Sequence, residues 1–325
     1  MNKLKSLLLV AIVATFAFSS CSKQEEENAP GESQNSNLTG ERNCGTMEAF
    51  YKQVESDPGL IARMNEIEAF TNNYIANARL LPDGTIEIPV VVNVLYKTAS
   101  QNISAAQIQS QIDVLNADFS ASNSDYGLTP SIFQGLRSGN IGITFVLDQV
   151  FRKATNKSSW STNNAMKKLS QGGINPTSPT TKLNMWVCNM GGGILGYAQF
   201  PGGSSSTDGV VIDDNAFGNT GTVSAPYHMG RTATHEVGHW MNLRHIWGDS
   251  TCGSDLVSDT PSHNTANYGC PNYPHYSTCS GSPVEMTMNY MDYTDDPCMY
   301  MFTGGQKTRM NAVFVSGGPR NSFAQ

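Results

Sequence analysis

The chain has 325 residues and a formal charge of −7, and only 14% of its residues are charged, against roughly 25% in ordinary soluble domains. The acidic balance argues against a nucleic-acid partner, and 39% hydrophobic residues argue against global disorder. Beyond residue 18 no apolar run approaches the ~20 residues that cross a bilayer, which excludes a polytopic membrane protein. Seven cysteines are an odd number, so in an exported protein the leftover thiols need an explanation.

The amino terminus is typical of an export signal. Two lysines precede an apolar run over residues 7–18, and Ser-Ser-Cys follows, ending at Cys21. This order of basic, apolar and small residues predicts a signal peptide over residues 1–20, with a short buried helix as the alternative. The ending also resembles a bacterial lipoprotein signal, which implies lipidation of Cys21. We therefore expect an exported protein, anchored in the outer membrane or at the cell surface only through this lipid, or secreted after cleavage.

Residues 21–80 are predicted to be a flexible tether and leader. Residues 22–40 contain no aromatic residue and one leucine, too little apolar surface to offset the entropy of ordering. Residues 45–80 carry apolar side chains at three- and four-residue spacings, which predicts helix. We expect a domain boundary between Ala78 and Gly84, followed by one domain over residues 81–325.

The rest of the chain mixes strands and helices. Pro82-Asp83-Gly84 is a turn signal, and the apolar run over residues 86–96 predicts a buried strand. Ser104 and Gln107 match a capping box at the start of a helix that extends to Phe119. Further strands are expected at 141–150, 183–187 and 210–212, and helices at 231–242 and from Thr303, where Gln306 completes a second capping box. This order predicts an α+β fold with an α/β-type upper subdomain, its sheet early and its helices late.

A pattern of metal-binding residues lies in the helix predicted at 231–242. His235 and His239 are four residues apart, ~40° around a helix and ~6 Å along it, so both imidazoles can reach one ion. Glu236 lies beside them, placed to take a proton from a water molecule that the metal activates. His245 can join them only if the helix ends first, and Asn242 supplies the break because Asn tolerates the left-handed conformation. Three histidines with a fourth position open are typical of catalytic zinc.

The segment from His235 to His245 resembles the long zinc motif of the metzincins, H-E-x-x-H-x-x-G-x-x-H, with Asn242 in the glycine position. The longer stretch HEVGHWMNLRHIWGD is similar to the pappalysin family, in particular its bacterial, ulilysin-like branch. The resemblance covers about residues 86–309. It implies a zincin fold with a twisted, mostly parallel sheet, an active-site helix, a Met-turn and a C-terminal helix.

The sequence NYMDYTDD, residues 289–296, resembles the Met-turn region of that family, and the resemblance implies three roles there. Met291 would form an apolar floor beneath the histidines, unless it is an ordinary core methionine. Tyr293 would donate a hydrogen bond to the tetrahedral intermediate, with aromatic packing as the alternative. Asp296 would lie at the bottom of the specificity pocket and favour Arg or Lys directly after the scissile bond. A calcium ligand or a loop-capping aspartate is the alternative for Asp296.

The long connection between His245 and Met291 is rich in Gly, Ser, Pro and Asn, and something must hold it in place. Four cysteines in or beside it allow three pairings, and the resemblance implies Cys252–Cys279 and Cys270–Cys298. A structural zinc on four thiolates is the alternative, but export favours disulfides. The sequence SDLVSDTP resembles a calcium loop of the family, whose oxygen donors suit calcium, with a cluster of Asx turns as the alternative. The residues concerned are Asp255, Val257, Asp259 and Thr260.

The leader contains the sequence Arg42-Asn43-Cys44-Gly45-Thr46. A thiolate is a strong zinc ligand, so Cys44 could fill the fourth position in place of water. The motif resembles the ulilysin-type propeptide, which implies a cysteine switch; an incidental thiol or an intermolecular disulfide is the alternative. Activation then requires a cut between Thr46 and Ile86, for which Ala78–Arg79 is a candidate bond. Cys188, at the end of an apolar strand, is expected to be a buried small hydrophobe.

Together these features predict an exported zinc endopeptidase made as a latent zymogen. Its substrates would be proteins or peptides with Arg or Lys just after the scissile bond, its catalytic metal zinc and its structural metal calcium. The first alternative is a surface lipoprotein that serves in binding or adhesion and carries an inactive metzincin fold. The intact His235, Glu236, His239, His245 and Met291 argue against it. The second alternative is a metalloenzyme with a non-peptide substrate.

Overall fold

The computed structural model describes residues 40–77 and 85–324. The predicted signal peptide, the lipidation site Cys21, the boundary at residues 78–84 and the Ala78–Arg79 bond lie outside the described residues. The predicted α+β fold is confirmed. Within the described residues no helix is long and apolar enough to cross a membrane.

A five-stranded sheet in the order β2-β1-β3-β5-β4 forms the framework. Four strands are parallel, and β4 runs antiparallel to β5 at one edge. The strands are β1 Ile86–Tyr96, β2 Ile143–Ala154, β3 Leu183–Cys188, β4 Gly196–Ala198 and β5 Val210–Asp213. The strand predicted at 141–150 is β2, which begins and ends later than expected. Strand β2 lies at the edge of the sheet, and its second half is mostly exposed and carries no apolar alternation that would mark its end. Strand β4 was not predicted, since three residues are too few to show a period.

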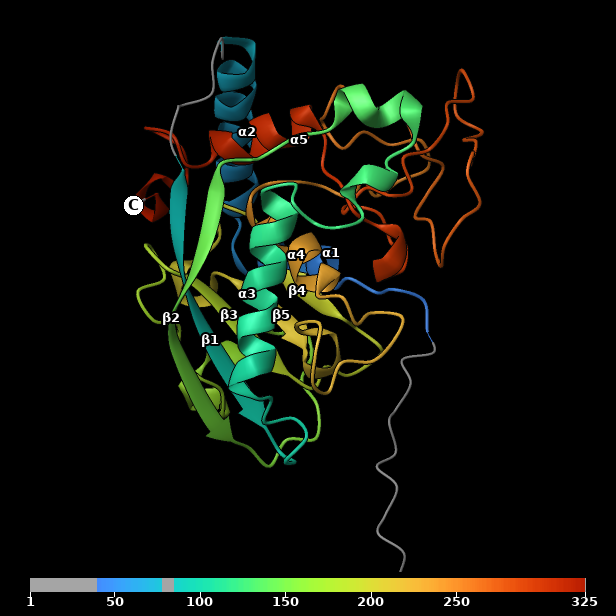
Figure 1. Cartoon of the computed structure of the whole chain (residues 1–325). Helices are drawn as coiled ribbons and strands as arrows, with labels where there is room; N and C mark the ends of the chain where they lie inside the picture. The colour runs from blue at the N-terminus through green and yellow to red at the C-terminus, as the bar shows by residue number, and fades with distance from the viewer. Residues whose placement is uncertain (1–39, 78–84, 325) are drawn as a thin grey trace, which may run out of the picture. The chain divides into compact units, whose positions relative to one another are not determined.

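The central strands β1 and β3 are buried on both faces, which is why they are almost continuously apolar. On one face, α3 (Ala105–Phe119) and α4 (Arg231–Trp240) cover the sheet (Figure 1) and share a core with Val92, Met185 and Ile212. On the other face, Trp186 and Cys188 pack with Trp160 and Met166 from the connection between β2 and β3. Cys188 is fully buried and unbonded, as predicted.

Of the two predicted capping boxes, one forms completely and the other only in part. Thr303 begins α5 (Gly304–Ala312) with a complete box, its side chain accepting from Gln306 and the Gln306 side chain accepting in return. Ser104 caps α3 through the backbone N–H of Gln107, but the Gln107 side chain donates to the carbonyls of Asp214 and Phe217 instead. The prediction for Gln107 was therefore half wrong, because a buried loop competes for its amide.

The leader forms two helices, α1 (Thr46–Ser56) and α2 (Leu60–Asn77), separated at Asp57-Pro58-Gly59. Both belong to the same compact unit as the sheet. Helix α1 packs against β4, and α2 lies beside α5 (Figure 1).

The connection after α4 has no helix or strand until residue 296, and two disulfides hold it, Cys252–Cys279 and Cys270–Cys298. His263 is buried inside it, where its Nε2 accepts from Met286 N and its Nδ1 lies 3.5 Å from Asp292. Short 3-10 segments complete the fold: Tyr126–Leu128, Ser131–Leu136, Ala165–Lys167, Leu169–Gln171, Ser205–Thr207, Asp214–Ala216, Asp296–Cys298 and Asn321–Phe323.

Candidate active site

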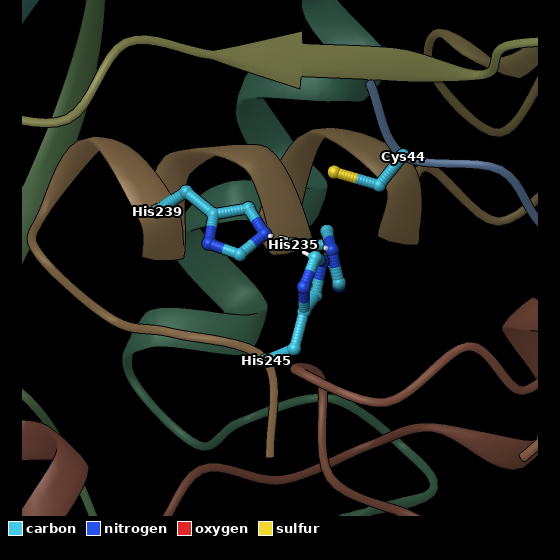
Figure 2. Close-up of side chains that lie close together, drawn as sticks. All are labelled: Cys44, His235, His239 and His245. Carbon is cyan, nitrogen blue, oxygen red and sulfur yellow. Dashed lines mark hydrogen bonds between the residues drawn. The ribbon is translucent and has the colours of Figure 1, made fainter. Parts of the chain in front are cut away.

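Three histidines converge at the end of α4. Figure 2 shows His235 and His239 on this helix and His245 on the segment after it, with Cys44 reaching toward them from the leader. The helix ends at Trp240, and Asn242 adopts φ +73°, the left-handed conformation that the sequence predicts. The chain therefore turns back, and Ile246 N donates to Met291 O at 3.1 Å, which fixes His245 beside the other two.

Each histidine is oriented by a hydrogen bond from its Nδ1. His235 Nδ1 lies 2.7 Å from Tyr290 O, and His239 Nδ1 lies 2.8 Å from Leu243 O. His245 Nδ1 lies 2.5 Å from a carboxylate oxygen of Asp249. All three partners are acceptors, so each Nδ1 carries the proton and each Nε2 presents a lone pair.

The three lone pairs point at one another. His239 Nε2 lies 3.1 Å from both His235 Nε2 and His245 Nε2, with no proton available between them. Burial and the neighbouring imidazoles lower the pKa of His235 well below its ordinary value and that of His239 to about 3. Neutral imidazoles with lone pairs this close repel unless a cation lies between them. The spacing fits zinc, whose nitrogen ligands lie ~2.0–2.1 Å from the ion, and the Cys44 thiol is within 4.8 Å of the same nitrogens.

Glu236 and Tyr293 lie beside this cluster. Burial raises the pKa of Glu236 to about 7, and its Oε2 accepts from the Thr46 hydroxyl at 2.8 Å and from the Cys44 thiol at 3.5 Å. The Tyr293 hydroxyl donates to Cys44 O at 3.3 Å, and its ring packs edge-on against His245. Both side chains therefore face the segment that carries Cys44.

Met291 lies beneath the active-site helix. It is fully buried, and a Cβ built on Gly238 would come within 2.6 Å of its sulfur. A side chain at position 238 would clash with this sulfur, so only glycine lets Met291 pack against the helix between His235 and His239. This position fits the floor role that the resemblance implies.

Asp296 is buried against the leader residue Arg42. Arg42 Nη2 lies 2.5 Å from Asp296 Oδ1, and the two side chains are 1% and 0% exposed. The other Asp296 oxygen accepts from Met229 N at 2.7 Å. The Arg42 guanidinium also donates to Thr294 O at 3.0 Å and to the Thr232 hydroxyl at 3.2 Å. Its Cζ lies 4.9 Å from the centre of the Tyr227 ring, within range of a cation–π interaction.

Residues 42–46, which we call the RNCGT segment, also pair with strand β4. Leu195 N donates to Asn43 O at 2.9 Å, and Gly45 N donates to Gly196 O at 2.8 Å, in a parallel bridge. Ala198 N then donates to the Thr46 hydroxyl at 2.8 Å. The backbone of the segment is thus fixed to the sheet edge while its side chains reach the histidines, Glu236 and Asp296.

The residues of the calcium-loop motif do not all come together. Thr260 donates its hydroxyl to the Asp255 carboxylate at 2.9 Å and lies 2.9 Å from Val257 O. Burial raises the pKa of Asp255 to about 6. Asp259 points elsewhere, accepting from the Thr303 hydroxyl and from Gly305 N at the start of α5. In the described part of the chain Asp255, Val257 and Thr260 therefore lie together, whereas Asp259 binds the amino-terminal end of α5.

Comparison with known proteins decides the family. The peptidase M43 model, described as pregnancy-associated plasma protein-A, matches residues 183–315. An extracellular metalloprotease of Verticillium alfalfae is 33% identical over 289 residues, which cover 85% of this chain and 91% of that protein. The chain belongs to the pappalysin family. With the zinc-type cluster in place, it is a zinc metalloprotease.

Two solved structures are similar to this chain over most of its length. A promirolysin mutant of Tannerella forsythia is 41% identical with a TM-score of 0.79, covering 87% of this chain and 97% of that one. Mature mirolysin of the same organism, in complex with a cleaved peptide, is 45% identical with a TM-score of 0.72, covering 75% and 97%.

Several residues of this pappalysin site were not predicted from the sequence. Asp249 orients His245, and its position four residues after that histidine is the signal that could have shown it. Thr46, Thr232, Thr294 and Tyr227 contact Glu236 or Arg42 from three different regions of the chain. Thr46 and Thr294 lie within motifs quoted above, but no local pattern shows the partners of the four, because each contact joins residues distant in sequence.

Proposed function

We propose that this pappalysin is an exported endopeptidase made in a latent form, which cleaves proteins or peptides directly before an arginine or lysine. One observation carries the proposal: the RNCGT segment contacts the histidine cluster, Glu236, Tyr293 and Asp296 at once. The names of relatives such as the Verticillium alfalfae extracellular metalloprotease support export.

Catalysis would use five residues of this chain. His235, His239 and His245 would hold a zinc ion, which supplies a Lewis acid that polarises the scissile carbonyl and makes water more acidic. Glu236 would take the proton of the attacking water and deliver it to the leaving amine. The Tyr293 hydroxyl would donate to the developing oxyanion. Its bond to the carbonyl of Cys44 supports this role, since it shows that the hydroxyl can donate to a carbonyl beside the histidines.

Latency would come from the same segment. The Cys44 thiol lies beside the histidine nitrogens, where it would be the fourth zinc ligand, and the Thr46 hydroxyl donates to a carboxylate oxygen of Glu236, the proposed base. A substrate cannot enter while both contacts persist. Cutting the chain between α2 and β1 would separate this segment covalently from the catalytic residues.

The specificity proposal rests on how Arg42 is bound. Its guanidinium meets the Asp296 carboxylate, the Thr294 carbonyl and the Thr232 hydroxyl, while Tyr227 covers one face. A lysine ammonium can reach the carboxylate but cannot match this planar arrangement of donors. We therefore expect arginine to be preferred over lysine after the scissile bond.

The test uses the processed protein and three quenched peptides that differ only after the scissile bond, carrying Arg, Lys or Leu. We expect the arginine peptide to be cleaved with a kcat/KM about tenfold above the lysine peptide, and the leucine peptide hardly at all. Asp296→Asn should lower the arginine kcat/KM most. Equal cleavage of all three peptides would contradict the specificity proposal, and no cleavage of any would contradict the proteolytic function.

Two further expectations remain part of the proposal. The first is that residues 1–20 are removed and that Cys21 is then lipidated. Growing wild-type and Cys21→Ala cells with radiolabelled fatty acid would test this, because only the wild-type protein should carry the label.

The second expectation is a structural calcium bound by Asp255, Val257 and Thr260. Added calcium should raise the Tm of the wild type and leave that of Asp255→Asn unchanged.

A further inference from the structure

Two buried arginines hold the carboxyl end of the active-site helix. Arg320 Nε donates to Trp240 O at 2.8 Å, and Arg309 Nε donates to Asn242 O at 2.8 Å. The last carbonyls of a helix lack partners within it and carry negative partial charge, so guanidinium groups stabilise them. Arg309 thereby contacts the left-handed residue that separates the second and third histidines.

The two arginines differ in their counter-ions. Arg320 pairs with Asp208, which lies between β4 and β5. Arg309 pairs with Glu68, on the leader helix α2. Its Nη1 and Nη2 lie 2.9 and 2.6 Å from the two carboxylate oxygens, a bidentate pair in which the Arg309 side chain is 1% exposed. Burial acts to raise the pKa of Glu68, but the bonds and charge of Arg309 outweigh it and lower that pKa below its ordinary value.

Helix α2 has further contacts around this pair. Arg63 Nε donates to Gly202 O at 2.8 Å, and a Cβ built on Gly202 would lie 3.0 Å from Ile67. At the other end, a Cβ on Gly317 would lie 3.2 Å from the Phe70 ring. Helix α2 therefore packs closely on the segment after β4 and on the segment after α5. None of these contacts involves the RNCGT segment or the histidines.

We propose that Arg309 is a carboxylate-binding site for Glu68, and that α2 is an anchor of the leader independent of the RNCGT segment. This inference rests on the proposed latency. A leader cut between α2 and β1 then stays bound without a covalent link and keeps the enzyme inhibited. Inhibition ends when the cut leader dissociates, which requires Glu68 to leave Arg309. Bidentate charged pairs that are shielded from water are strong, and removing one partner leaves the other charge buried alone.

The test uses the full chain with a recognition site for an unrelated protease inserted between residues 78 and 84. Glu236→Gln prevents self-cleavage and keeps an oxygen for Thr46. After cutting, the leader should co-elute with the rest of the chain in gel filtration. Glu68→Gln should weaken its retention at least ~10-fold, whereas Glu66→Gln, which makes the same charge change on an exposed residue of the same helix, should leave it unchanged. Equal retention of the two variants would overturn the proposal.

A second readout separates this inference from the proposed latency. In chains that keep Glu236, the uncut Glu68→Gln protein should be as inactive as the uncut wild type, and only the cut protein should gain activity on dilution. If the uncut wild type is already active, the latency proposal fails, while gel filtration still decides whether Glu68 and Arg309 retain the leader. Equal thermal unfolding of the uncut Glu68→Gln and Glu66→Gln chains would show that the fold is intact.

Discussion

The leader meets the catalytic part of the molecule in two regions that differ in kind. In the first, the RNCGT segment places Arg42, Cys44 and Thr46 on groups that would do the chemistry. In the second, α2 places Glu68 and its neighbours on groups that hold the fold, above all Arg309. We therefore propose different roles for the two regions. The RNCGT segment blocks the catalytic groups, and α2 supplies affinity between the leader and the rest of the protein. The first three predictions below weaken the RNCGT segment and leave the α2 contacts in place, and the fourth tests a contact outside both regions.

The largest effect is expected from Arg42→Ala. It leaves the Asp296 carboxylate buried without its cation, and breaking a buried pair costs ~3–5 kcal/mol. The residual activity of the uncut chain on a small peptide should therefore rise more than ~100-fold. Arg42→Lys is the matched control and should have a smaller effect. If both variants stay as latent as the wild type, Asp296 has no part in holding the leader.

Cys44→Ala should come next. A four-ligand zinc site is worth ~10–16 kcal/mol, so one ligand contributes ~3 kcal/mol and its loss should raise the activity of the uncut chain ~100-fold. The comparison is with Cys188→Ala, which removes another buried thiol outside the disulfides and should leave latency unchanged. An uncut Cys44→Ala chain that stays fully latent contradicts the cysteine switch.

Thr46→Val should have a smaller effect in the same direction. It removes the hydroxyl that donates to Glu236 and accepts from Ala198 N, and a hydrogen bond to a charged group is worth ~1.5–3 kcal/mol. We expect activity of the uncut chain to rise about tenfold, with Thr46→Ser close to the wild type because it keeps the hydroxyl. A serine variant as active as the valine variant would show that the methyl group, not the hydroxyl, matters.

The smallest effect is expected at Glu48, on the outer face of α1. Its pair with Lys52 is half exposed on both sides, and such pairs contribute ~0.3–0.5 kcal/mol. Glu48→Gln should change latency and leader retention by no more than about twofold. A tenfold change in either would mean that α1 is a third anchor and that the division into two regions is wrong.

The parts of the molecule that the sequence predicts well are those with a local pattern. The apolar run of β1 predicts both ends of the strand, and the spacing of His235, His239 and Asn242 predicts the bend that brings in His245. The parts that it does not predict depend on partners far away. Arg42 and Asp296 are separated by 254 residues, and Glu68 and Arg309 by 241. Arg42 and Asp296 lie in motifs that the sequence marks, but nothing local joins the two motifs. Glu68 and Arg309 lie in no motif, so only the folded chain shows either pair.

The most direct test of the central claim is the effect of Glu236→Ala on the processed protein. The account predicts that cleavage of the arginine peptide falls below detection, while zinc content by mass spectrometry stays at about one ion per chain, as expected for ligands that remain intact. Retained cleavage in this variant would contradict the account.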